Sequence, residues 1–238
     1  MCGDRTRGTG GETAGCKKSV ENVVGNFGII KNWQGNPLRV KEVLWCTLTK
    51  KTVLALAGSP VKGGSTDILL DQVLRGARMK GASVEKIYLR ELEITPCNSC
   101  GKCEKTGECP INDDMKWLYK KLLKSHVIIL TSPIYFMGLP AQSKSMVDRC
   151  QAIWVRRFKL KKKFGEGDRK GFFISVGGME RPHLFKGAVA TVKAFFTTIG
   201  VRYAGDLLFS KVEDKEDIMR HPTAIKDALE AGAKLISD

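Results

Sequence analysis

From residue 51 onward the chain alternates apolar runs of strand length with segments whose apolar residues recur at helical spacing. No other feature of the sequence constrains the fold as strongly. Residues 52–58 and 127–131 are almost wholly apolar, as central strands of a parallel sheet are when helices cover both faces. Such alternation is typical of βαβ units around a parallel sheet. We therefore expect an α/β fold, a doubly wound three-layer sandwich.

Five strands and five helices are predicted in strict alternation. The strands are expected at residues 52–58, 83–89, 127–131, 171–176 and 201–209, and the helices at residues 66–80, 113–124, 139–155, 185–199 and 222–236. No internal repeat and no second domain is found. Residues 1–50 lack a sustained period, so we expect a poorly ordered N-terminal arm there and one domain over residues 51–238.

The composition excludes two classes of protein. Hydrophobic residues make up 42% of the 238 and charged residues 27%, enough apolar residues for a core, which argues against a wholly disordered chain. No apolar run approaches the roughly 20 residues that cross a bilayer, so no membrane association is expected. Asp4, Arg5, Arg7 and Glu12 interrupt the stretch where a secretory signal would be apolar, and we expect a cytoplasmic protein.

The loop after the first predicted strand, GSPVKGGST, has the composition of a phosphate-binding turn. Ser59, Ser65 and Thr66 offer hydroxyl donors, Lys62 adds positive charge, and two glycines allow close backbone approach at a helix start. The pattern matches neither GxxxxGK[ST] nor GxGxxG, which leaves a mononucleotide phosphate. A plain strand-to-helix turn capped by Ser65 is the alternative.

The loop after the third predicted strand suits a planar ring. It contains Pro133, Ile134, Tyr135, Phe136 and Met137 at the same edge of the sheet, although these aromatics could also belong to the core or an interface. After the fourth strand, Gly177 and Gly178 could close over the ring. A ligand with a phosphate bound by the first loop and a planar ring bound by the second has the composition of FMN.

The segment 96–110 contains a CxxCxxCx5C run, the most specific motif in the chain. Cys97, Cys100, Cys103 and Cys109 can surround one small metal centre, because two intervening residues let successive sulfurs converge. A 4Fe-4S cluster is the interpretation that we favour. A zinc site of four thiolates, or a degenerate site without metal, remains open.

Residues 51–238 resemble the NADPH-dependent FMN reductase group of flavodoxin-like proteins, and the cysteine run is similar to that of its iron–sulfur flavoprotein branch. The resemblance rests on GSPVKGGST, PCNSCGKCEKTGECPINDDM, SPIYFMGLPAQSKSMVDR and DIMRHPTAIKDALEAGAKL. It implies a flavodoxin-like sheet of order 2-1-3-4-5, a homodimer or homotetramer, and FMN with its phosphate in the first loop and its ring against residues 133–137. It also implies that the four cysteines ligate a 4Fe-4S cluster.

A flavin can accept two electrons together or one at a time, whereas an iron–sulfur cluster passes one electron at a time. FMN and a cluster together would therefore convert between two-electron and one-electron transfer. We expect electrons to pass between a soluble carrier, a ferredoxin or NAD(P)H, and a small acceptor such as oxygen, peroxide or a quinone. No side chain need be catalytic. An NAD(P)H-dependent FMN or quinone reductase without a cluster is one alternative, and a non-catalytic nucleotide- or nucleic-acid-binding module is another.

The positive charge is concentrated in one segment. The chain has 40 Lys plus Arg against 25 Asp plus Glu, a formal charge of +15, of which residues 156–170 contribute eight basic and two acidic side chains. We interpret this segment as a solvated loop, or as a patch that steers an acidic ferredoxin or NADPH. No nucleic-acid-binding motif accompanies it, so no specific nucleic acid is expected. Cys150, alone on the third predicted helix, is expected to be a small buried apolar residue, and the three histidines are expected to be surface or capping residues.

Overall fold

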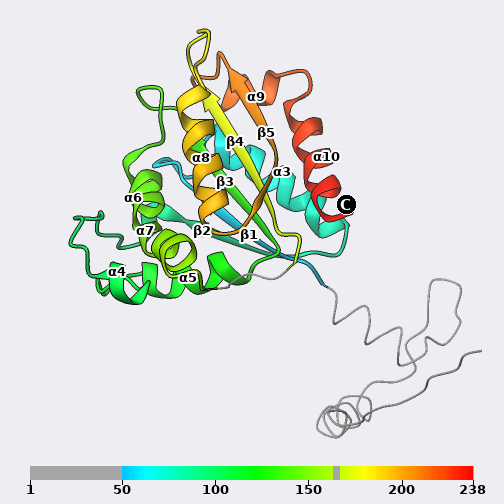
Figure 1. Ribbon diagram of the computed structural model, residues 1–238. Helices are drawn as coiled ribbons and strands as arrows, with labels where there is room; N and C mark the ends of the chain where they lie inside the picture. Colours follow the sequence, from blue (N-terminus) through cyan, green and yellow to red (C-terminus); the bar gives the residue numbers. More distant parts are fainter. Residues whose placement is uncertain (1–49, 163–166, 238) are drawn as a thin grey trace, which may run out of the picture. The chain divides into compact units, whose positions relative to one another are not determined.

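The core of the fold is a five-stranded parallel sheet between two layers of helices (Figure 1). The computed structural model describes residues 50–162 and 167–237; the predicted arm, with Cys2, Cys16 and Cys46, lies outside the described residues. The strand order is β2-β1-β3-β4-β5, and every neighbouring pair is parallel, which confirms the predicted flavodoxin-like order. The strands are β1 Thr52–Ala57, β2 Ser83–Tyr88, β3 Val127–Pro133, β4 Lys170–Gly177 and β5 Arg202–Ser210.

Helices cover both faces of the sheet, and each face has its own buried cluster of apolar side chains. One face packs against α3 Ser65–Met79, α9 Lys215–Arg220 and α10 Ala224–Ser237. The other packs against α5 Met115–Lys124, α6 Ala141–Arg149, α7 Gln151–Trp154 and α8 Lys186–Thr198. Along β1, Val53 and Ala55 contribute to the first cluster while Leu54 and Leu56 contribute to the second. This alternation explains why a central strand is apolar at every position.

Two predicted helices differ from those observed. The helix predicted at residues 139–155 ends at Arg149 and is followed by α7 and a π-helical turn, Val155–Lys159. The helix predicted from residue 222 begins at Ala224 and is preceded by α9. His221 has an extended backbone, with ψ at 129°, because the following Pro222 disfavours the helical conformation there. Its Nδ1 accepts hydrogen bonds from the N–H groups of Thr223 and Ala224, so His221 caps α10.

Helices α3 and α10 approach each other closely because glycines face each other across their contact. A Cβ at Gly232 would lie 1.9 Å from the carbonyl oxygen of Val73, and a Cβ at Gly76 would lie 2.0 Å from that of Leu229. These distances are far shorter than a van der Waals contact, so the two backbones could not approach this closely with larger side chains.

The interpretation of residues 156–170 as a solvated loop is wrong for two of its basic residues. Arg169 and Lys170 are each only 4% exposed. Arg169 donates hydrogen bonds to the carbonyl oxygens of Ser125 at 2.9 Å and Ile199 at 2.8 Å, and to that of Leu122. Arg169 therefore binds backbone carbonyls at the C-terminal ends of α5 and α8, which is a structural use of a cation.

Two further observations concern a cysteine on the helical layer and the length of the helices. Cys150 is buried as predicted, and burial raises the pKa of its thiol to about 12. Within residues 50–162 and 167–237, no helix combines the length and the apolar character that crossing a bilayer requires.

Candidate functional site

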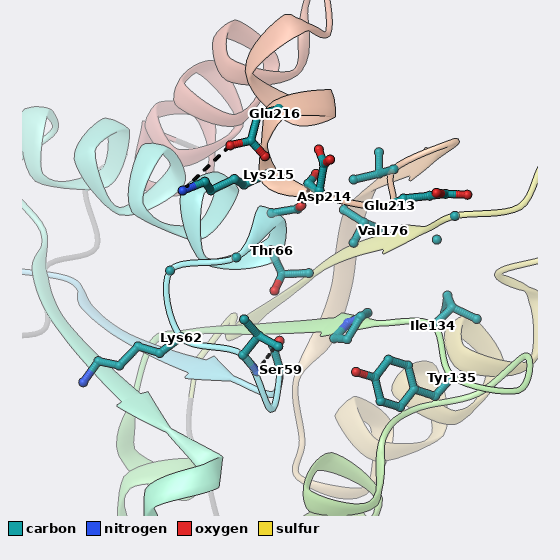
Figure 2. A pocket seen from close by; sticks show the side chains of 18 residues that line it. Ser59, Lys62, Thr66, Ile134, Tyr135, Val176, Glu213, Asp214, Lys215 and Glu216 are labelled. Carbon is teal, nitrogen blue, oxygen red and sulfur yellow. Dashed lines mark hydrogen bonds and ion pairs between the residues drawn. The ribbon is translucent and has the colours of Figure 1, made fainter.

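A pocket of about 740 Å³ lies where β1, β3 and β4 end, at the carboxyl edge of the sheet. This volume is within the range of about 300–1,000 Å³ typical of small-molecule sites, and this edge is where ligands bind in doubly wound folds. Three predicted segments line the pocket together: Ser59, Lys62, Ser65 and Thr66 from the first loop, Pro133, Ile134 and Tyr135 from the second, and Gly177 and Gly178 from the third. Figure 2 shows the labelled side chains around it.

The loop between β1 and α3 is braced by the buried carboxylate of Asp67. The N–H of Gly63 donates to Asp67 Oδ2 at 2.8 Å, and the hydroxyl of Tyr88 donates to the same oxygen at 3.1 Å. Lys86 Nζ lies 2.7 Å from Asp67 Oδ1. Gly63 has a φ of 74°, the left-handed conformation that favours glycine. The loop is therefore held in one shape, with the first N–H groups of α3 still without partners inside the helix.

The hydroxyl and ammonium groups of this loop have different orientations. Thr66 is buried, while Ser65 Oγ donates to the carbonyl oxygen of Asp214 at 2.7 Å. Lys62 extends away from the centre of the pocket (Figure 2), and its Nζ lies 3.0 Å from Glu91 Oε1. The hydrogen bond to Glu91 raises the pKa of Lys62. Ser59 Oγ accepts a hydrogen bond from the N–H of Val61 at 3.0 Å, which leaves its own proton for another acceptor.

The second predicted segment is split between the pocket and the solvent. Pro133, Ile134 and Tyr135 line the pocket, but Phe136 and Met137 are outside its lining residues, and Phe136 is fully exposed. The N–H groups of Tyr135 and Gly138 each donate to the other's carbonyl oxygen, and both residues between them have positive φ. The tip of the loop is therefore a tight turn, and both of its central residues are exposed to solvent.

The loop from β5 to α9 also lines the pocket, and sequence reasoning missed it. Val212, Glu213, Asp214, Lys215 and Glu216 contribute to the lining. Asp214 caps α9: its side chain accepts from the N–H of Asp217, while Asp217 accepts from the N–H of Asp214. This loop follows a predicted strand, and parallel strands all end at the same edge of the sheet. Its position in the sequence could therefore have predicted that it lines the pocket.

Residues 96–110, which contain the four cysteines, form the cysteine loop. Two adjacent aspartates after it bond to the residues before it, and these paired residues are the stem of the loop. Asp113 Oδ2 accepts from the N–H of Thr95 at 3.0 Å, and Asp114 Oδ2 accepts from the N–H of Glu93 at 2.8 Å. The N–H of Asp114 returns a bond to the carbonyl oxygen of Glu93 at 3.2 Å. Residues just before Cys97 and just after Cys109 are thus joined.

All four predicted ligands line one pocket of about 140 Å³. Cys97 and Cys100 are exposed, and Cys103 and Cys109 are partly buried. Burial, with smaller contributions from the other three cysteines, raises the pKa of Cys103. Within the described residues, no three His, Cys, Asp or Glu side chains are arranged as a metal-binding group. The structure therefore brings the four thiols to one pocket without placing them at ligand distances.

A buried arginine forms the back of this pocket. Arg149 is 1% exposed and lies among the pocket-lining residues. It contacts Asp113 through two N–H···O bonds, with Nη1 2.5 Å from Oδ2 and Nη2 3.1 Å from Oδ1, and Nη1 also donates to the carbonyl oxygen of Thr95 at 2.7 Å. Burial alone would raise the pKa of Asp113, but the hydrogen bonds from Arg149 and from the N–H groups of Thr95 and Met115 hold that pKa below its usual range.

Basic residues of the π-helical turn and of the segment just after it contact the cysteine loop. Lys159 Nζ lies 3.3 Å from Glu104 Oε1, and Lys162 Nζ donates to the carbonyl oxygen of Thr106 at 3.4 Å. A Cβ at Gly107 would lie 2.8 Å from Cβ of Arg156, so the loop and the turn are in direct contact. Part of the basic segment predicted from the sequence therefore borders the cysteines.

Comparison with known proteins gives consistent results. A sequence model of the family described as NADPH-dependent FMN reductase matches residues 52–210. Over 113 residues the chain is 37% identical to an iron-sulfur flavoprotein of Methanocaldococcus jannaschii, covering 48% of this chain and 58% of that protein. Over 151 residues it is 32% identical to an iron-sulfur flavoprotein of Archaeoglobus fulgidus, covering 63% and 66% respectively. These alignments span less than two thirds of each relative's length.

Solved structures share the fold. An NAD(P)H:quinone oxidoreductase from Methanothermobacter marburgensis superposes with a TM-score of 0.60 at 14% sequence identity, covering 79% of this chain and 96% of that one. At this identity the likeness concerns the arrangement of the sheet and helices.

Proposed function

The chain belongs to the NADPH-dependent FMN reductase family, and on that basis we propose that it is an FMN-dependent oxidoreductase whose pocket at the carboxyl edge of the sheet binds FMN. The observation that carries the proposal is the meeting of three separately predicted loops around one pocket of about 740 Å³. When bound, FMN exchanges two electrons as a hydride or one electron at a time.

The chemistry of the pocket fits the two ends of FMN. The start of α3 supplies N–H groups to the phosphate, and Ser59 and Thr66 add hydroxyl groups close by. Pro133, Ile134 and Tyr135 present an apolar surface to one face of the ring. Gly177 and Gly178 allow the backbone to approach the ring closely from β4. Lys62, paired with Glu91, contributes through its charge alone.

We further propose that Cys97, Cys100, Cys103 and Cys109 ligate a 4Fe-4S cluster. The donor set fits, because four thiolates are the usual ligands of such a cluster and all four cysteines line one pocket. The stem made by Asp113 and Asp114 fixes both ends of the loop, so that cluster binding needs to order only the residues between. The two exposed cysteines have room to turn towards the other two.

The basic residues beside the cysteine loop support a partner of opposite charge. Arg156, Arg157 and Lys159 lie on the π-helical turn that contacts the loop, and Lys161 and Lys162 come shortly after it. Such a surface would steer an acidic one-electron carrier, such as a ferredoxin, towards the cluster. The electrons would then reach a small acceptor through FMN. NAD(P)H is the other donor that we consider.

The test is anaerobic purification followed by assays of iron, acid-labile sulfide and flavin. We expect about four irons and four sulfides per FMN, as the composition of the two proposed cofactors requires. Cys100→Ser should abolish the iron signal and retain FMN. Cys150→Ala is the matched control, because it removes a buried thiol outside the run and should retain both cofactors.

Three results would contradict these proposals separately. Protein that stays colourless with excess FMN would refute the flavin site. Flavin without iron or sulfide would refute the cluster and favour the alternative of an NAD(P)H-dependent FMN or quinone reductase. Loss of FMN in Cys100→Ser would show that the two sites do not bind independently.

A further inference from the structure

Arg149 is a buried cation with an incomplete set of hydrogen bonds. Its side chain is fully buried, and Nη1 and Nη2 are used by Asp113 and the carbonyl oxygen of Thr95. Its Nε is also buried, yet it has no hydrogen-bond partner among the residues that the structure describes. A buried N–H without an acceptor is destabilising, so native proteins rarely leave one unpaired.

The unpaired donor belongs to a residue that lines the cysteine pocket. Arg149 is the cationic side chain among the residues around that pocket, which include all four cysteines. The other charged side chain in the lining, Glu104, is exposed and pairs with Lys159. Asp113 faces Arg149 from the stem, and Tyr119 donates its hydroxyl proton to the backbone carbonyl of Arg149. Neither contact supplies an acceptor for Nε.

A cluster ligated by four thiolates carries net negative charge and exposes sulfur atoms that accept hydrogen bonds. Hydrogen bonds to these sulfurs and nearby charge are two of the factors that set the reduction potential of a cluster. A buried N–H donor has a strong effect, because a low local dielectric strengthens its interaction with the sulfur.

We propose that Arg149 is a positioning residue for the cluster, whose Nε–H donates a hydrogen bond to a cluster or cysteine sulfur and thereby raises the cluster's reduction potential. The inference rests on the cluster that we propose above. The same side chain positions the ligands, because its bonds to Asp113 and Thr95 close the stem of the cysteine loop.

The decisive variants remove the donor without changing the net charge of the pair. Arg149→Met with Asp113→Asn replaces a neutral ion pair by two neutral side chains, so a change of potential in fully loaded protein does not come from a change in net charge, and the ¹⁵N measurement below separates the hydrogen bond from the stem contacts. We expect the equilibrium constant for one-electron reduction of the cluster to fall between threefold and tenfold. At about 59 mV per tenfold change this is a decrease of about 28 to 59 mV.

A matched control lies on the same helix. Lys144 and Asp148 form an exposed i,i+4 ion pair on α6, with Nζ 2.7 Å from Oδ1. Lys144→Met with Asp148→Asn makes the same chemical change outside the pocket lining. EPR-monitored redox titration should give this control the potential of the wild-type protein, since the solvent screens exposed charges.

A second measurement takes its main result from the wild-type sequence, so the presence or absence of the signal there does not depend on the folding of a variant. Protein labelled with ¹⁵N-arginine is reduced, and pulsed electron–nuclear double resonance is recorded on the cluster signal. We expect a ¹⁵N coupling that disappears in Arg149→Lys, which keeps the charge but has no Nε.

Three results would overturn the inference. A fully loaded double variant with wild-type potential would do so, as would the absence of an arginine ¹⁵N coupling in the wild-type protein. Both leave the cluster assignment intact. Wild-type protein without iron would instead refute the cluster itself, and the inference with it.

Discussion

Gly58, at the end of β1, is the position where one added methyl group should most directly disturb the proposed phosphate loop. Its N–H donates to the carbonyl oxygen of Thr131 at 2.8 Å, and its own carbonyl oxygen accepts from Ser143 Oγ at 3.1 Å. A Cβ at this position would lie 2.1 Å from Ser143 Oγ and 2.6 Å from the Thr131 oxygen. Gly58→Ala therefore creates two clashes of different kinds.

The two clashes have different costs. Ser143 Oγ can rotate away, at the price of its hydrogen bond to Gly58, which is worth about 0.5–1.5 kcal/mol. The Thr131 oxygen belongs to the backbone of a central strand and cannot move alone, so β1 must shift, at a cost of about 1–3 kcal/mol typical of overpacking. We expect Gly58→Ala to lower the free energy of unfolding by about 2–4 kcal/mol in total.

Urea unfolding monitored by far-UV circular dichroism measures this free energy, and flavin fluorescence quenching measures FMN affinity, which should fall as the loop shifts. Ser143→Ala is the control, and it should cost about 1 kcal/mol. The double variant Gly58→Ala with Ser143→Ala should remain clearly less stable than Ser143→Ala. A Gly58→Ala protein within 0.5 kcal/mol of wild type would refute the reasoning, and full recovery in the double variant would assign the entire cost to the hydroxyl.

Three further predictions concern the packing, the stem and the phosphate loop. Gly232→Ala should destabilise the protein by about 3 kcal/mol or more in urea unfolding, because its Cβ would lie 1.9 Å from the carbonyl oxygen of Val73. Because the pKa of Asp113 is lowered in the folded state, its stabilisation is complete above the unfolded pKa near 4 and is lost as the pH falls through the folded pKa. Wild type should therefore lose more stability than Asp113→Asn in acid unfolding below about pH 4. Lys62→Gln should weaken FMN binding by less than about threefold in a fluorescence titration, since its ammonium pairs with Glu91 in an exposed ion pair.

The arrangement of the sheet could be predicted because each strand carries the evidence in its own residues. Residues 52–58 and 127–131 are apolar on both faces, which fixes them as central strands, and parallel strands must place their following loops at one edge. From this rule we expected the loops that contain Ser59, Tyr135 and Gly177 to lie at one edge of the sheet, and all three residues line one pocket. It applies equally to the acidic loop after β5, and that loop could have been predicted.

Other details depend on contacts that the sequence does not display. Phe136 and Met137 have positive φ in a tight turn, and aromatic and apolar composition alone cannot predict that the turn directs them out of the pocket. The many charges of residues 156–170 predicted a solvated loop, yet Arg169 within it is buried. Its partners are carbonyl oxygens of Leu122, Ser125 and Ile199, distant in the sequence.

Helix α6 contacts both proposed sites, and its geometry shows how closely they are linked. Ser143, in its first turn, bonds to Gly58 at the start of the phosphate loop, and Arg149, its last residue, bonds to the stem of the cysteine loop. These two positions are six residues apart, which corresponds to about 9 Å along a helix axis at 1.5 Å per residue. Within α6 both residues belong to one hydrogen-bonded helix, so the two proposed sites share a structural element. Because Arg149 and Ser143 are held by different partners, a substitution at either one tests whether the flavin pocket and the cysteine loop respond together or separately.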